Sequence, residues 1–151
     1  MSYTNESGRL QILDDAGAAA DELGTALAIL GDAYEHLDEH SGDRVEEVVF
    51  RPLQAAYGQL KRTHAEFAAR YNLPGRTFDA GDPGLPADVR VLLERVADAA
   101  QAADDTLAEL QDSLLPVEVG DEALRAGLSR TRTLIAPVPA TCDNVIRTLG
   151  R

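Results

Sequence analysis

Tryptophan is absent from this sequence, and aromatic residues make up only 5% of its 151 residues. A core without large rings depends on Leu, Val and Ala, which suits closely packed helices better than a thick β-sandwich. The single cysteine, Cys142, excludes an intramolecular disulfide and gives no support for a cysteine-based metal site. Because such cysteine usage is typical of a reducing compartment, we expect a cytoplasmic protein.

Basic residues are also scarce, since one lysine and 13 arginines face 26 acidic residues and leave a net charge of −12. Nucleic acids and anionic bilayers attract basic surfaces, so we expect neither as a partner. No segment approaches the roughly 18 consecutive apolar residues of a membrane span. Residues 1–8 are polar and lack the apolar run of a secretory signal. We expect residues 1–8 to be a disordered tail and residues 9–151 to form one domain.

Four stretches, 9–39, 43–71, 87–115 and 121–149, place an apolar residue at every third or fourth position. A helix returns such positions to one face, so each stretch predicts a long helix with a buried stripe. The first stretch shows the pattern best, with the series Leu13, Ala16, Ala20, Leu23, Leu27, Leu30, Tyr34 and Leu37. The fold class expected is all-α, an antiparallel up-down-up-down four-helix bundle.

Prolines interrupt two of the predicted helices. Pro52 lies inside the second helix, and Pro137 and Pro139 lie inside the fourth. Because proline removes a backbone donor and clashes with the preceding turn, both helices are expected to kink or break there.

The segment 72–86 is the one long irregular connection, with three prolines and three glycines among its 15 residues. Connections of this length usually perform a function or cover a surface. We expect Phe78 to cover the open end of the bundle while Arg76 stays outside, which makes these two residues the surface candidates of the loop.

Charge alternates along the sequence. Residues 9–40 and 87–115 carry net charges of −7 and −5, whereas residues 43–71 and 121–151 carry +1 and +2. In an up-down-up-down bundle each acidic helix would lie between two mildly basic ones. Charge complementarity is therefore expected to select this topology.

His64 is the most unusual polar residue in the apolar pattern, because it occupies a position of the buried stripe. A buried imidazole needs a hydrogen-bond partner, which Glu94 of the third helix, or Asp15 or Asp21 of the first, would supply at that height. His64 and Glu94 are therefore candidates for a ligand site. The alternative is a core histidine whose hydrogen bonds are satisfied within the protein.

His36 and His40 are four residues apart near the expected end of the first helix, beside Glu35 and Glu39. This spacing on one helical face would hold a divalent metal ion. The alternative is that both histidines complement the helix dipole. The Glu-x-x-His motif of di-iron bundles is absent from the sequence, which argues against that chemistry.

The sequence contains no nucleophile beside a base, no phosphate-binding loop and no paired metal motif. It therefore favours a non-enzymatic interaction or accessory protein without a cofactor, which binds a protein partner or a second copy of itself. The alternative is a bundle that binds a small molecule or a metal ion, through His64 with a carboxylate or through the His36 and His40 pair.

Overall fold

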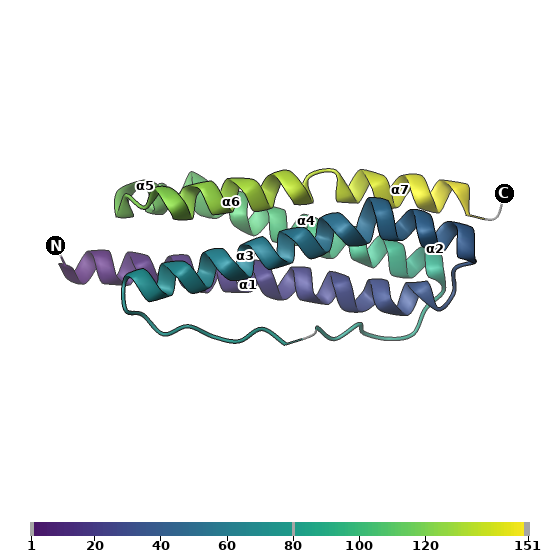
Figure 1. The fold of residues 1–151 in the computed structure, drawn as a ribbon, viewed down its shortest axis with the longest axis horizontal. Helices are drawn as coiled ribbons and strands as arrows, with labels where there is room; N and C mark the ends of the chain where they lie inside the picture. Colours follow the sequence, from purple (N-terminus) through teal and green to yellow (C-terminus); the bar gives the residue numbers. More distant parts are fainter. Residues whose placement is uncertain (1, 80, 150–151) are drawn as a thin grey trace.

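The computed structural model describes residues 2–79 and 81–149, and helices dominate it as the sequence predicts. The helices are α1 (Ser2–Tyr34), α2 (Glu39–Val45), the π-helical segment η1 (Glu46–Phe50), α3 (Arg51–Arg70), α4 (Val89–Asp112), α5 (Leu115–Val119), α6 (Glu122–Ile135) and α7 (Val138–Thr148). Helices α2, η1 and α3 follow one another without interruption, and α6 and α7 align end to end, so the chain packs as a bundle of long rods (Figure 1).

The directions of the rods differ from the predicted order. Asp121, at the start of α6, pairs with Arg70 at the end of α3, and Arg132 of α6 pairs with Asp104 of α4. Helices α3 and α4 therefore both run antiparallel to α6, and both also run antiparallel to α1 (Figure 1). The order is up-down-down-up, and the predicted up-down-up-down order is wrong.

The connection between α3 and α4 explains the difference. We call its described residues, 71–79 and 81–88, the strap. The 18 residues between the two helices reach up to about 60 Å when extended, whereas the 20-residue α3 is about 30 Å long. The strap is long enough to return along the whole bundle, and Figure 1 shows it doing so.

This connectivity changes which rods are neighbours. Helix α1 packs against α3 and most extensively against α4, while α6 packs against α3 and α7 against α4. The acidic helices α1 and α4 are therefore adjacent rather than separated by basic ones. The predicted alternation of charge around the bundle does not occur.

The apolar stripe of each predicted helix forms the core. Fully buried residues come from every rod, including Leu23, Leu60, Leu107 and Leu128. Leu114, which falls within the predicted helical stretch 87–115, is instead 58% exposed. It lies beyond the end of α4 and takes the left-handed backbone conformation, with φ of 68°, which turns the chain toward α5.

Two boundaries also differ from the sequence expectations. Residues 2–8, predicted as part of a disordered tail, belong to α1, and Met1 lies outside the described residues. Helix α1 ends at Tyr34 rather than near Glu39, because Asp38 accepts a hydrogen bond from the Ser41 backbone N–H at 2.7 Å and caps α2.

The prolines coincide with changes in helix type. The backbone widens to the π-helical segment η1 immediately before Pro52, and the Arg51 N–H bonds to the carbonyl of Glu46. Helix α6 ends at Ile135, and Pro137 occupies the position immediately before α7, which begins at Val138. Proline lacks the backbone N–H that a regular α-helix needs, so interruptions at these places are expected.

Candidate functional site

His64 lies on α3 and is 3% exposed, as its place in the predicted stripe required. Its Nδ1 atom is buried and has no hydrogen-bond partner among the described residues. The ring of Phe78, from the strap, contacts it edge-on with the ring centroids 5.3 Å apart. An unpaired buried nitrogen typically costs about 1 to 3 kcal/mol, so this position is unusual for a core residue.

Arg76 fixes the strap over this histidine. Its guanidinium forms two hydrogen bonds with the carboxylate of Asp21 on α1, at 2.8 and 3.1 Å, and lies 4.2 Å above the Phe78 ring. Further along, Gly81 lies against the α1 backbone, where a Cβ atom would come within 2.5 Å of the Thr25 nitrogen. Only glycine allows this close approach.

A pocket of about 400 Å³ opens between α1 and the strap, and His64 contributes to its lining. Apolar groups come from α1 and from the strap, and charged groups from both. The other lining residues are Leu10, Leu13, Asp14, Ala18, Asp21, Pro74, Gly75 and Arg76. The pocket therefore combines an apolar wall with carboxylates and an imidazole.

Burial lowers the pKa of His64 below its ordinary value, and the nearby Arg76 guanidinium acts in the same direction. The Leu13 carbonyl and the Asp14 carboxylate oppose this shift without reversing it. The imidazole is therefore neutral at pH 7, and a neutral imidazole offers one acceptor nitrogen as well as one donor.

Three of the sequence-predicted residues, His64, Arg76 and Phe78, come together at this place. Phe78 covers the side of the bundle, over His64, rather than its open end. Glu94 does not join them. It lies exposed near the start of α4, at the opposite end of the bundle from the C-terminal part of α3 that carries His64 (Figure 1). The pairing of His64 with Glu94 assumed that α3 and α4 run in opposite directions, and they do not.

The predicted metal ligands lie apart from this pocket. His36 falls in the turn after α1 and His40 in α2, so the two residues do not share one helical face as their spacing suggested. Within residues 2–79 and 81–149, no group of three or more His, Cys, Asp and Glu side chains is arranged to hold a metal ion.

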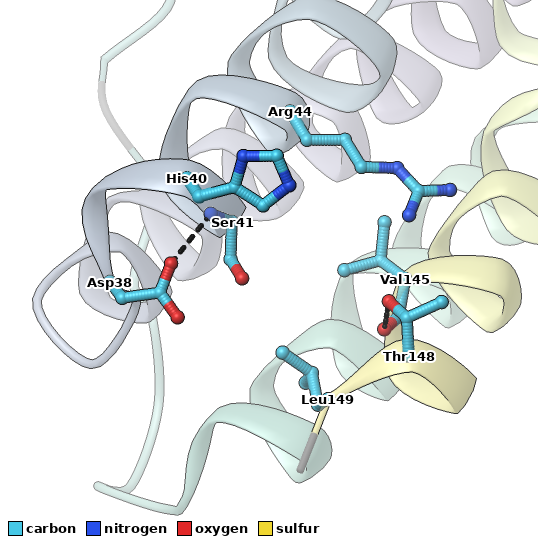
Figure 2. Close-up of a pocket in the computed structure, with 7 residues that line it drawn as sticks. All are labelled: Asp38, His40, Ser41, Arg44, Val145, Thr148 and Leu149. Atoms are coloured by element: carbon cyan, nitrogen blue, oxygen red, sulfur yellow. Dashed lines mark hydrogen bonds between the residues drawn. The ribbon is translucent and has the colours of Figure 1, made fainter. Parts of the chain in front are cut away.

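A second hollow, of about 410 Å³, lies at the end of the bundle where α2 meets α7. Figure 2 shows His40 and Arg44 on α2 facing Val145 and Thr148 on α7. Asp38 also lines it and accepts the hydrogen bond that caps α2. The side chains of Asp38, His40 and Arg44 are exposed, so this hollow offers a ligand little burial.

The sequence analysis does not predict a cluster of polar side chains at the C-terminal end of α3. Asp121, only 7% exposed, accepts hydrogen bonds from Arg70, Tyr71 and the Leu124 backbone N–H. Burial would raise the pKa of Asp121, but these hydrogen bonds outweigh it and lower the pKa. Every acceptor position of the carboxylate serves to cap α6 and join it to α3, so the cluster is structural. Asp121 begins the predicted stretch 121–149, but its contact with Arg70 depends on the topology, which helical periodicity does not set.

Charge is distributed unevenly over the bundle. Helix α1 carries one basic and six acidic residues, and α4 carries two basic and six acidic residues. The rod of α2, η1 and α3 has equal numbers of each, and α6 with α7 has a net charge of +2. Since α1 and α4 are neighbours, the molecule has an acidic side, which we call the α1–α4 face.

Comparisons of the chain with protein-family models, with curated proteins and with solved structures each find no match. No helix among the described residues combines the length and the apolar character needed to cross a membrane.

Proposed function

We propose that this protein is a non-enzymatic interaction module that presents the α1–α4 face to a basic protein partner. The observation that carries the proposal is that two helices with net charges of −5 and −4 pack side by side. The other two rods carry net charges of 0 and +2.

This arrangement has an electrostatic cost. Neighbouring helices of like charge repel each other, and a bundle that alternated charges would avoid the repulsion. Within the described residues α4 has one acidic group in a salt bridge, Asp104, which pairs with Arg132 at 2.9 Å. Burial of apolar residues between α1 and α4 holds the pair together. A concentrated acidic surface then attracts a partner of opposite charge and speeds its association.

The rest of the proposal follows from composition and burial. A cytoplasmic location agrees with the single cysteine, whose thiol is fully buried. Nucleic acid is not proposed as a partner, because it would be repelled by the acidic face. A second copy of this chain would be repelled by the same face, so self-association, if it occurs, uses another surface.

The test compares two variants as bait in an extract of the native cell. In one, Asp98→Asn and Glu109→Gln remove two exposed charges from α4; in the other, Glu47→Gln and Glu66→Gln remove two exposed charges from the α2–α3 rod. We expect a basic partner to be retained by the wild-type protein and by the second variant, and to be released from the first.

Salt dependence provides the second readout. The affinity for an electrostatically recruited partner falls as ionic strength rises, because surface charges are screened beyond about 10 Å at 0.1 M salt. A partner that binds the two variants equally, or that is indifferent to salt, contradicts the assignment of the α1–α4 face.

A further inference from the structure

The pocket beside His64 has a chemical character that goes beyond a protein-binding surface. We propose that this pocket binds a small organic monocation, an ammonium group carried on a short apolar body. The site is formed by α1, by His64 of α3 and by the first part of the strap.

The buried histidine is the first observation. The side chain of His64 is only 3% exposed, yet its Nδ1 atom makes no hydrogen bond to any described residue. An apolar side chain would fill the same position without an unsatisfied nitrogen. Nδ1 itself is closed off from solvent. The imidazole nevertheless lines the pocket of about 400 Å³, so a ligand there contacts the ring through its other nitrogen, Nε2.

The charges of the pocket indicate the sign of the ligand. Arg76 and Asp21 neutralise each other through two hydrogen bonds. Asp14, which also lines the pocket, has no ion pair or hydrogen bond among the described residues and remains uncompensated. The pocket therefore carries a net charge of one negative unit, and the other acidic residues of α1 add to its attraction for a cation.

The remaining groups indicate the shape of the ligand. With its proton on Nδ1, the neutral imidazole accepts a hydrogen bond at Nε2, and the Asp14 carboxylate accepts others, so an ammonium group finds two kinds of acceptor. Leu10, Leu13 and Pro74 supply an apolar wall for the rest of the molecule. Ligand sites commonly combine such a wall with a few convergent polar groups.

The test is a titration of the ¹⁵N-labelled protein with 2-phenylethylammonium, monitored by amide chemical shifts. The matched control is 3-phenylpropanoate, which has a similar apolar body and the opposite charge. We expect the ammonium probe to bind at millimolar concentration, as is usual for a ligand of this size. The shifts should concentrate at Leu13, Ala18, His64 and Gly75, and the carboxylate probe should leave them in place.

Two variants assign the binding groups. Asp14 is exposed, so Asp14→Asn should fold normally and weaken binding of the ammonium probe about three- to fivefold, the effect of losing one exposed charge interaction. His64→Leu keeps the volume and removes the nitrogens, and should weaken binding further. Glu47→Gln, on η1 and outside the pocket, is the control for general charge and should bind like the wild-type protein.

Equal binding of the two probes would overturn the proposal, and so would unchanged binding by the Asp14 variant. An absence of shifts at these residues with about 10 mM ammonium probe would also overturn it. Circular dichroism of the His64 variant shows whether it folds, and the Asp14 variant decides the outcome if it does not. Because the probes are small molecules, these results are independent of whether a protein binds the α1–α4 face.

Discussion

A close contact between α3 and α6 gives a sharp test of the packing. Gly127 of α6 lies against Thr63 of α3, and both residues are buried. A Cβ atom on residue 127 would overlap Thr63 Oγ1 and would lie 2.7 Å from its Cγ2 and 3.0 Å from its Cβ. Rotating the threonine cannot relieve all three contacts, because its Cβ atom does not move with the rotation. Gly127→Ala should therefore force the two helices apart.

The sign of the effect follows from two opposed terms. Alanine in a helix interior is favoured over glycine by about 1 kcal/mol. Overpacking a buried contact costs about 1 to 3 kcal/mol, and the high end applies where the neighbour is rigid. We expect Gly127→Ala to lower the free energy of unfolding by about 1 to 2 kcal/mol, measured by urea denaturation with circular dichroism.

The matched control is Gly58→Ala in the middle of α3, where the new Cβ atom would meet only the mobile end of the Arg62 side chain at 3.3 Å. This substitution should stabilise the protein by roughly 0.5 to 1 kcal/mol. Thr63→Ala combined with Gly127→Ala should recover part of the loss, with a coupling energy of at least about 0.5 kcal/mol. If Gly127→Ala is as stable as the wild-type protein, the α3–α6 contact is misassigned.

Three further predictions concern polar groups. The Tyr71 hydroxyl donates a hydrogen bond to Asp121 at 3.0 Å, whereas the buried Tyr34 hydroxyl has no partner among the described residues. In urea denaturation, Tyr71→Phe should lower the free energy of unfolding by about 1 kcal/mol and Tyr34→Phe should leave it unchanged. Equal losses in the two variants would refute this. Because the pKa of Asp121 is lowered in the folded protein, the contribution of this carboxylate to the free energy of unfolding is complete above the ordinary pKa of 3.8 and is lost as pH falls through the lowered pKa. The melting temperatures of the wild-type protein and Asp121→Asn should therefore differ at pH 7 and converge toward pH 2. Burial, and to a lesser extent the negative charge of Asp143, raises the pKa of the Cys142 thiol to about 12. A thiol reagent should therefore label Cys142 only after urea unfolds the chain. Rapid labelling in buffer without urea would contradict this burial.

The sequence alone determined the helices and the residues that line the core. Spacings of three and four residues place apolar side chains on one helical face whatever the topology, and the predicted stripe residues Leu13, Leu23 and Leu30 are indeed buried. The cap of α6 likewise depends only on local chemistry, because Asp121 needs only the backbone N–H of Leu124, three residues on. The burial of His64 followed from the same periodicity.

The tertiary structure decided the order of the helices and, through it, both the candidate site and the charge distribution. A connection of 18 residues is long enough either to form a slack turn or to cross the length of the bundle, and helical periodicity is the same in both cases. Because the strap crosses the length of the bundle, α3 is parallel to α4 and His64 is far from Glu94. The same path places Phe78 over the imidazole and makes the two acidic helices neighbours. These contacts join residues far apart in the chain, and only the packing of the rods sets which of them meet.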